Sequence, residues 1–323
     1  MSGTIETVTG PIQAEQLGVT LMHEHIFVRN LELEANFPAP EWDEEVFIQR
    51  AREGLQALMA RGIRSMVDLT VIGLGRDIHP IIRIAEGLDF NIIAATGYYT
   101  FKDLPSFFHN HGPGRMIEGP DPLHQMFVRD IREGISGTRV KAGIIKVATD
   151  KPGFTPDVTR VFEAAVRAHK DTGVPITTHS DAAEKGGLEQ QDFFRRNGVD
   201  LTRTVIGHCG DSDDFDYLQR LMDAGSFIGM DRFGLTWFAT DEARTRTVAK
   251  LCRRGYADRM TLSHDAGYYS VNSEPSYRDK ALPAWKHTLI SDVIIPRLRE
   301  QGVTEAQLHQ MMVVNPTRIL AAR

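Results

Sequence analysis

The sequence predicts a (β/α)8 TIM barrel of the α/β class. Eight short runs of apolar and β-branched residues recur along the chain, and segments with helical spacing separate them. Several of these runs are apolar at consecutive positions, which is typical of parallel strands that are buried on both faces. A TIM barrel is closed by eight parallel strands, each followed by a helix, and the pattern here supplies that number.

The eight candidate strands are rich in the residue types that favour extended structure. They are Val19–Val28, Ser65–Val71, Phe90–Tyr99, Val140–Thr149, Pro175–Ser180, Thr204–Cys209, Ser226–Arg232 and Met260–Ala266. The fourth of them contains Gly143, Ile144 and Ile145 in succession, and the third is apolar through most of its length. Both are therefore predicted to be strands that are buried on both faces.

Helices are predicted between these strands from apolar residues that recur every three or four positions. Two such series are Phe47, Ala51, Leu55 and Leu58 before Gly62, and Phe215, Leu218 and Met222 before Gly225. Each glycine is a typical helix end. Thr155 and Pro156 predict the start of another helix, because threonine caps free amides and proline has no amide to satisfy. That helix is expected to end near Gly173.

A single domain over residues 1–323 is the simplest interpretation of this pattern. We find no low-complexity tract, linker of Pro and Ser, or sequence repeat in the chain. The alternative is a doubly wound open sheet, but such sheets often carry a GxGxxG turn after the first strand, and none occurs there. The non-periodic stretch from Gly267 to Leu282 would overhang the active face of a barrel.

Composition excludes several classes of protein. The chain has 37 Lys and Arg against 43 Asp and Glu, a net charge of −6, so we expect no nucleic-acid or membrane partner. Its two cysteines, Cys209 and Cys252, cannot form a disulfide framework, which favours a cytoplasmic location. The N-terminus lacks a basic segment followed by an apolar one, and no apolar stretch is long enough for a membrane span.

Two histidines, His23 and His25, lie near the end of the first predicted strand. On a strand of period two, both imidazoles point the same way, into the barrel. Further residues of the kinds that bind metals end later strands, and these are His179, His208 and Asp265. Because the carboxyl ends of barrel strands meet at one rim, the sequence predicts a metal site there.

Lys146 interrupts the otherwise apolar fourth strand. A buried lysine costs free energy unless it is paired or neutral. One interpretation is an ion pair with Asp68 or Asp231. The other starts from its position at the same rim as the histidines, where two dications would lower the pKa of the amine. A neutral amine can add CO2, and the resulting carbamate can bridge two metals.

Charge balance favours the carbamate on Lys146. Two divalent cations are nearly neutralised by Asp265, this carbamate and a bridging hydroxide together, and such a centre is hydrolytic. Asp265 would also take the proton of the hydroxide and pass it toward the leaving group. In this scheme the more buried metal is held by His23, His25, Lys146 and Asp265, and the more exposed one by Lys146, His179 and His208.

Six motifs occur in order over nearly the whole chain: HxH, GxxK, THS, GHCGD, GMDRFG and SHDA. In this respect the chain resembles the phosphotriesterase branch of the amidohydrolase superfamily. The resemblance implies a binuclear centre bridged by a carbamylated lysine and a hydroxide, and usually a homodimer. Carried over residue by residue, the metal positions are His23, His25, Lys146, His179, His208 and Asp265. The metal stays open among Zn, Co, Mn and Fe.

Two positions favour a lactonase within this branch. Phosphotriesterases proper have a histidine where this chain has Arg232, whereas phosphotriesterase-like lactonases have the arginine and a tyrosine that matches Tyr99. The resemblance implies hydrolysis of N-acyl-homoserine lactones, hence quorum quenching, with weak organophosphate triesterase activity. Tyr99 would polarise the lactone carbonyl. Arg232 would contact substrate and steady Asp231 and the rim, or form a structural ion pair.

The lactone substrate is expected to meet side chains from the loops after the last two strands. These are Leu235, Trp237, Tyr268 and Tyr269, with Phe238 beside them and Tyr99 and Arg232 nearer the metals. Asp211 is expected to cap the following helix, and the alternative for it is a hydrogen bond to the rim. Two other functions stay open, a phosphotriesterase or carboxylesterase of the same superfamily and a metal-bearing binding protein without turnover.

Overall fold

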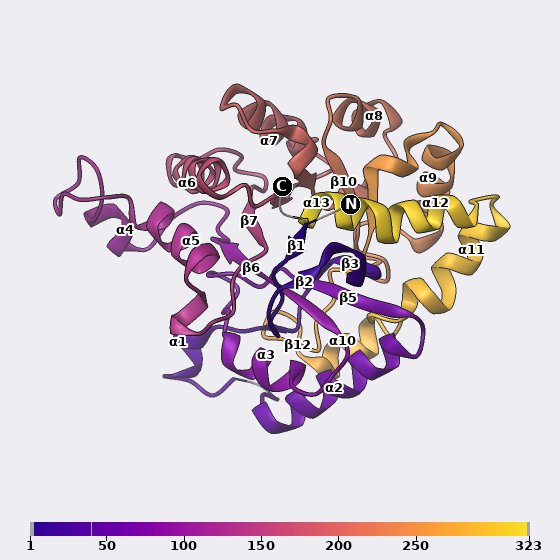
Figure 1. The fold of residues 1–323 in the computed structure, drawn as a ribbon, viewed down its shortest axis with the longest axis horizontal. Coiled ribbons are helices and arrows are strands. Elements are labelled where there is room, and N and C mark those ends of the chain that lie inside the picture. Colours follow the sequence, from indigo (N-terminus) through magenta and orange to yellow (C-terminus); the bar gives the residue numbers. More distant parts are fainter. Residues whose placement is uncertain (1–2, 40, 322–323) are drawn as a thin grey trace.

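A computed structural model describes residues 3–39 and 41–321 as a nearly closed barrel of eight parallel strands surrounded by helices (Figure 1). The barrel strands are β3 (Val19–Glu24), β5 (Ile63–Asp68), β6 (Asn91–Gly97), β7 (Ile144–Ala148), β8 (Ile176–His179), β9 (Thr204–Ile206), β10 (Phe227–Met230) and β11 (Met260–Leu262). Each barrel strand after β3 pairs with the barrel strand that precedes it in the chain. The predicted fold class is confirmed, and the strands are shorter than the apolar runs.

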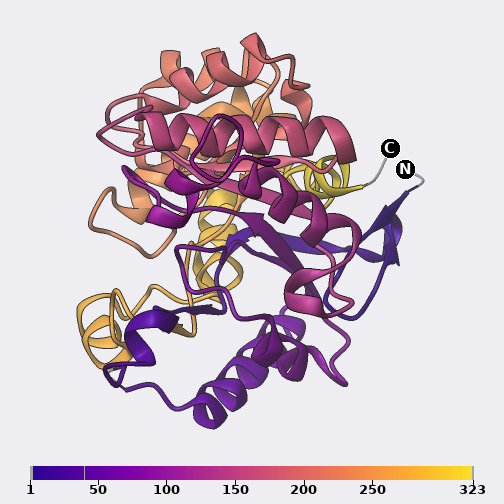
Figure 2. The same ribbon diagram turned by 90° about the vertical axis from the view of Figure 1, so that its left-hand side faces the viewer.

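Helices connect successive strands and form the outer layer, as Figures 1 and 2 show. Between barrel strands lie α1 (Leu31–Glu34), α2 (Glu44–Met59), α3 (Ile78–Ala85), α4 (Ser106–Asn110), α5 (Pro122–Arg132), α6 (Pro156–Thr172), α7 (Gly186–Arg196), α8 (Phe215–Asp223) and α9 (Asp241–Arg253). After β11 come α10 (Pro275–Ala281), α11 (Ile295–Glu300), α12 (Glu305–His309) and α13 (Asn315–Leu320). None of the helices in the described ranges is long and apolar enough to cross a lipid bilayer.

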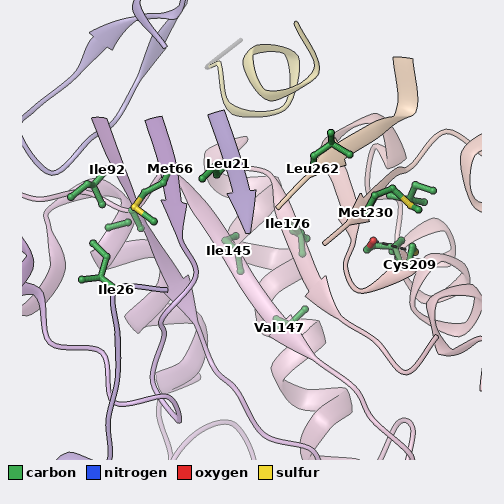
Figure 3. Packing of buried hydrophobic residues seen from close by; sticks show 14 of the residues in the cluster. Leu21, Ile26, Met66, Ile92, Ile145, Val147, Ile176, Cys209, Met230 and Leu262 are labelled. Atoms are coloured by element: carbon green, nitrogen blue, oxygen red, sulfur yellow. Dashed lines mark hydrogen bonds between the residues drawn. The ribbon is translucent and has the colours of Figure 1, made fainter. Parts of the chain in front are cut away.

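Side chains alternate between the helix layer and the barrel interior. Met66 and Ile145 belong to the large cluster shared with the helices, whereas their neighbours Val67 and Ile144 belong to a second cluster inside the barrel. Figure 3 shows Met66 of β5 and Ile145 and Val147 of β7 among the side chains of the large cluster. Lys146 has the parity of Ile144, so the alternation that packs the core also turns this lysine inward.

A bulge in β3, between Leu21 and Glu24, breaks this alternation at the first of the two histidines proposed as metal ligands. Leu21 pairs with Met66 and Glu24 with Asp68, so three steps along β3 match two along β5. The extra residue reverses the parity, as β-bulges do near active sites. Leu21 faces the helices, and strict alternation would send His23 the same way. The bulge turns His23 into the barrel. Period-two alternation predicted this direction for His23 without taking the bulge into account.

The barrel closes where β3 meets the residues that follow β11. The Asp265 N–H donates to the His23 carbonyl at 3.0 Å, and the His25 N–H donates to the Ala266 carbonyl at 2.8 Å. The His23 N–H donates to the Ser263 hydroxyl at 2.7 Å. We call this contact between residues 23–25 and 263–266 the closing seam. It joins the early and late parts of the chain at the carboxyl ends of the strands.

Local capping agrees with the sequence in one helix and differs in another. Thr155 accepts a hydrogen bond from the Val158 N–H at 3.2 Å and caps α6, which ends at Gly173 as predicted. The expected capping role of Asp211 is wrong, because Asp214 caps α8. The stretch from Gly267 to Leu282 is also more regular than predicted. It contains α10 and a short strand, β12 (Tyr269–Ser270), that pairs with β4 (Phe27–Val28).

A short hairpin precedes the barrel, and the sequence reasoning did not predict it. Its strands are β1 (Thr4–Ile5) and β2 (Ile12–Gln13), which pair antiparallel. Ile5 is buried with Ile144 and Phe227 in the interior cluster. The hairpin therefore contributes an apolar side chain to the core inside the barrel.

Candidate metal centre

A pocket of 220 Å³ opens at the carboxyl ends of the barrel strands. The six side chains proposed as metal ligands all line it, together with Tyr99 and apolar side chains from the loops above. The six are His23, His25, Lys146, His179, His208 and Asp265. Residues from five strand ends therefore meet in one cavity, and all six side chains are largely buried.

Asp231, at the end of β10, holds two of the histidines from behind. Its carboxylate accepts hydrogen bonds from Nδ1 of His23 and from Nδ1 of His208, each at 2.9 Å. The backbone N–H of His208 also donates to it, at 3.0 Å. Burial alone would raise the pKa of Asp231, but its interactions with His208 and His23 outweigh that effect and hold this pKa well below its usual range. Nδ1 of each ring is thereby occupied, and Nε2 faces the pocket.

The other two histidines have acceptors of their own. Nδ1 of His25 lies 2.9 Å from the Thr70 hydroxyl, which in turn donates to Asp68 at 2.6 Å. His179 is turned the other way round, with Nε2 bonded to Asp150 at 3.1 Å. Its Nδ1 therefore carries the lone pair that faces the pocket. In each ring one nitrogen is held by the protein, which is the usual arrangement around metal-binding histidines.

Burial favours the neutral form of His179 and of His208. It lowers the pKa of His179 to about 4 and the pKa of His208 well below the ordinary value, with Arg232 adding to both effects. A neutral imidazole with its second nitrogen hydrogen-bonded is the form that coordinates a cation. The electrostatics thus prepare these rings as ligands without any proton having to leave first.

The free nitrogen and oxygen atoms gather in two groups. His23, His25 and Asp265 place one candidate ligand atom each within 4.8 Å of one another, and Nε2 of His25 lies 3.2 Å from Asp265 Oδ1. Nδ1 of His179 and Nε2 of His208 lie 2.7 Å apart. Two neighbouring groups of N and O atoms, aimed at one cavity, fit two divalent cations of the first transition row.

Lys146 lines the same pocket, beside His23 of the first group. Its Nζ is 2.9 Å from Nε2 of His23 and 3.1 Å from the carbonyl oxygen of Thr178. Neither carboxylate considered as its partner is bonded to it, because Asp68 binds Thr70 and Asp231 binds the histidines. Desolvation by burial lowers the pKa of the Lys146 amine to about 7. An amine with this pKa is substantially neutral near physiological pH.

Arg232 connects Asp265 with a charged network behind it. Its Nε donates to Asp265 Oδ2 at 3.1 Å, and its Nη1 donates to Asp211 at 2.8 Å. Asp211 also accepts from the buried Arg244, which explains why its side chain is here and not at a helix start. His208, Arg232 and Asp265 all have left-handed backbone angles, with φ of 62°, 67° and 54°. Such strain in residues with a Cβ is typical of functional sites.

The Tyr99 hydroxyl points toward the histidine pair. It lies 3.2 Å from Nδ1 of His179, and the two rings meet edge to face with centroids 5.4 Å apart. Burial and the charge of Asp265 raise the pKa of Tyr99 far above its usual value, so the hydroxyl keeps its proton. Tyr99 is therefore a hydrogen-bond donor at the edge of the candidate metal centre.

The entrance of the pocket has an apolar, aromatic rim. Leu235, Trp237 and Phe238 line it, and Trp237 and Phe238 are 55% and 60% exposed. The Phe238 ring also covers the Arg232 guanidinium, whose central carbon lies 4.6 Å from the ring centroid. Trp285 completes this side and donates from its indole N–H to the His264 carbonyl at 2.8 Å.

The two predicted substrate contacts Tyr268 and Tyr269 do not line this pocket. Tyr268 stacks on His287, with ring centroids 4.5 Å apart, and its ring packs against the backbone of α2. Tyr269 lies in an aromatic cluster with Trp42 at a centroid distance of 4.7 Å. Pairing of β12 with β4 turns both rings into the protein, because aromatic surface is more stable when buried there.

Comparison with known proteins agrees with this geometry. The model of the phosphotriesterase family matches residues 3–320. The chain belongs to the phosphotriesterase family. It is 49% identical over 315 residues to a phosphotriesterase homology protein of Mycobacterium tuberculosis, covering 98% of this chain and 97% of that one. It is 39% identical over 314 residues to an aryldialkylphosphatase of Saccharolobus solfataricus, covering 96% and 97%.

A solved structure is also similar throughout. The phosphotriesterase from Mycobacterium tuberculosis superposes with a TM-score of 0.95 at 49% sequence identity, and the match covers 98% of each chain. Phosphotriesterase-family proteins are hydrolases with binuclear metal centres, and this chain is a hydrolase of that family. Its clusters of histidine and aspartate fit such a centre.

Three residues that support the histidines were missed or left without a role by the sequence reasoning. Thr70 and Asp150 were not singled out, and Asp231 was considered only as a partner of Lys146 or of Arg232. Asp150 lies two residues after the end of β7 and Asp231 directly follows β10, so both lie at the carboxyl ends of strands, where the active rim is. Barrel enzymes place functional residues at the carboxyl ends of their strands. Examining every carboxylate at such a position would have found both residues.

Proposed function

We propose that this phosphotriesterase-family hydrolase is a lactonase that opens N-acyl-homoserine lactones and hydrolyses organophosphate triesters weakly. The observation that carries the proposal is the Tyr99 hydroxyl, a protonated donor 3.2 Å from Nδ1 of His179 inside the pocket. A donor at this point can bind a lactone carbonyl oxygen and stabilise the negative charge that develops on it. Quorum quenching would be the biological outcome.

The six pocket residues would hold two divalent metals, of which Zn, Co, Mn and Fe all suit the ligands. When bound, these metals polarise a carbonyl or phosphoryl oxygen and make water nucleophilic near neutral pH. We propose further that Lys146 carries a carbamate. Its buried amine faces His23, has no carboxylate bonded to it among the described residues, and has a lowered pKa, all of which favour addition of CO2.

Asp265 would manage the proton of the reaction. Its Oδ2 would accept a proton from the attacking water and deliver it to the leaving oxygen. Arg232, bonded to the same oxygen at 3.1 Å, cannot carry the proton away, because the surrounding carboxylates raise the pKa of its guanidinium further. The alkoxide of an opened lactone stays tethered near Asp265 and needs that proton. This arrangement therefore suits a lactone better than a triester with a stable leaving group.

The acyl chain would lie along the rim formed by Leu235 and Trp237, where apolar surface is already present. Trp237 is 55% exposed, so covering it with an acyl chain would remove apolar area from water. Different chain lengths can use the same surface, because an open rim does not limit length as a closed pocket does. The weak triesterase activity would use the same metal centre, and a triester would bury less apolar surface against the rim than an acyl chain does.

Triester hydrolysis as the main activity is the second candidate. It is favoured by the similarity to the aryldialkylphosphatase, which extends over 96% of this chain. A carboxylesterase would use the same centre, and a binding protein without turnover would hold the metals alone. The chemistry of Arg232 and Tyr99 favours a lactone substrate over these alternatives.

The test is a comparison of kcat/KM for a series of homoserine lactones with paraoxon and an aryl ester, each with and without a chelator. We expect the lactones to be hydrolysed fastest and all activity to disappear with the metal. Faster turnover of paraoxon would make the protein a phosphotriesterase, and faster turnover of the aryl ester would make it a carboxylesterase. If the protein binds metal but hydrolyses none of these substrates, it is a metal-bearing binding protein and not an enzyme for these compounds.

We also propose two properties of the protein as a whole. The family resemblance favours a homodimer, and the small number of cysteines favours a cytoplasmic location. Light scattering of the purified protein at several concentrations tests the first. Fractionation of cells that produce the untagged chain tests the second.

A further inference from the structure

Glu24 lies between the two histidines of the first barrel strand and points away from the pocket. It is fully buried, and its carboxyl group reaches across the closing seam. Oε1 accepts hydrogen bonds from the His264 N–H at 2.9 Å and from His264 Nδ1 at 2.7 Å. Oε2 accepts from the Ala266 N–H at 3.2 Å. The carboxyl group therefore binds the backbone on both sides of Asp265.

Asp265 itself is held in a conformation that needs such support. Its φ is +54°, in the left-handed region that is unfavourable for a residue with a Cβ. Its own N–H donates to the His23 carbonyl at 3.0 Å. The three consecutive N–H groups of residues 264–266 are thus all bound by residues 23 and 24.

The surroundings of Glu24 extend this contact into the loop after β11. His264 Nε2 accepts the Ile290 N–H at 3.0 Å, and His287 Nε2 lies 3.0 Å from the Ala266 carbonyl and 3.6 Å from Glu24 Oε2. Both imidazoles are buried. The left-handed turn at Asp265 is therefore fixed from Glu24 on one side and from the segment around residues 287–290 on the other.

We propose that Glu24 is a positioning residue for the metal centre: it holds the His264–Ala266 backbone so that Asp265 faces His25. The inference rests on the proposed role of Asp265 as a metal ligand. One residue of the first strand thereby sets the distance between ligands that lie at opposite ends of the sequence. His23 and His25 supply imidazoles on one face of the strand, and Glu24 aligns their partner from the other face.

The test compares Glu24→Ala and Glu24→Gln with the wild-type holoenzyme. Metal content after dialysis, Zn²⁺ affinity by chelator competition and the visible spectrum of the Co²⁺ form are measured, together with Tm. We expect Glu24→Ala to lose about 10–100-fold in Zn²⁺ affinity, as is common when supporting groups of metal ligands are removed. Glu24→Gln is expected to lose less, because its amide oxygen can still accept both hydrogen bonds from His264.

Asp130→Asn is the matched control. Asp130 is also a buried carboxylate that ties elements together, through Arg76 and Thr96, but it contacts none of the proposed metal ligands. We expect this variant to lower Tm and to keep wild-type Zn²⁺ affinity and the wild-type Co²⁺ spectrum. The same loss of affinity in Asp130→Asn as in the Glu24 variants would overturn the proposal, because general destabilisation would then explain it.

The remaining outcomes also decide the question. Wild-type affinity and spectrum in a folded Glu24→Ala would overturn the positioning role. If Glu24→Ala does not fold, Glu24→Gln decides, since weaker Zn²⁺ binding in a folded protein supports the role and unchanged binding contradicts it. A wild-type protein that binds metal without hydrolysing lactones would refute the lactonase and leave this inference standing. A wild-type protein that binds no metal would refute both.

Discussion

The floor and the rim of the pocket are built in different ways. On the floor, buried histidines are each held by a second protein group, as His23 and His208 are by Asp231. At the rim, Trp237 and Phe238 are more than half exposed. The floor comes from strand ends and the rim from loops. Ordered hydrogen bonds fix the first, whereas surface packing alone supports much of the second.

This difference separates two aspects of function. A floor whose ligands are oriented in advance determines the reaction type, because the positions of its nitrogen and oxygen atoms vary little. An exposed apolar rim determines which substrates bind, and a change there costs little elsewhere in the fold. Substitutions on the floor should therefore act on metal binding and kcat, and those at the rim on KM.

The largest expected effect is at Lys146, in the centre of the floor. Lys146→Ala should lose lactone hydrolysis by more than about 100-fold, because the proposed carbamate would bind the metals directly, and removing such a ligand costs more than removing a supporting group. Metal analysis should show fewer than two ions per chain, and kcat should fall. Wild-type rates with full metal content would contradict the bridging role. Added short carboxylic acids, which can replace a carbamate, should restore part of the activity.

The next largest effect is expected at Tyr99, where floor and rim meet. Tyr99→Phe should lower kcat on lactones by about 100-fold, the usual cost of losing one oxyanion donor. Paraoxon hydrolysis should fall much less, because this proposal gives Tyr99 its role on the carbonyl of a lactone. Kinetics on both substrates with the same enzyme preparation measure the contrast. Equal losses on the two substrates would remove the main support for a lactone preference.

Asp231 supports the floor without facing the pocket. Asp231→Asn should weaken metal binding by about 10–100-fold, because its amide cannot accept hydrogen bonds from both His23 and His208. Chelator competition measures the affinity, and Tm monitors the fold. Excess metal should restore most of the activity if the substrate site is otherwise intact. Unchanged affinity would mean that the two rings are oriented by packing alone.

At the rim a smaller and more selective effect is expected. Trp237→Ala should raise KM for long-chain lactones by about 10-fold or less, because only part of the indole surface would be covered by an acyl chain. KM for short-chain lactones and kcat for both should stay close to wild type. A KM series over chain lengths tests this. An equal rise in KM for every chain length would place the acyl chain elsewhere.

The smallest effect is expected at Tyr268, which was first predicted to contact substrate. Its hydroxyl is buried and has no hydrogen-bond partner among the described residues, so Tyr268→Phe removes a polar group that burial disfavours. Lactone kcat/KM should change by less than about twofold, and Tm should stay the same or rise. A large rise in KM would restore Tyr268 to the substrate site.

The same contrast explains what the sequence could predict. Strand periodicity gave the barrel and the convergence of strand ends, since Lys146 shares its parity with the interior residue Ile144. Even so, His23 points inward because of a bulge that no local pattern announces. Asp231 and Asp150 follow strands and were overlooked as supporting groups.

The rim was predictable only in part. Leu235 and Trp237 line the pocket, but Tyr268 and Tyr269 are turned inward by a short strand that pairs with β4. That pairing joins residues more than 200 positions apart, so neither local composition nor spacing could reveal it. A loop side chain takes the direction that its long-range partners impose, whereas a strand side chain takes much of its direction from its own sequence.

The closing seam has a consequence for biosynthesis. His23 leaves the ribosome long before Asp265, whose amide it must bind, so the early part of a nascent chain exposes histidines with no complete cation site. A chain that stops before residue 263 would lack Asp265 and the residues that close the barrel against β3. The proposed metal centre would therefore be complete only after the last barrel strand has been synthesised.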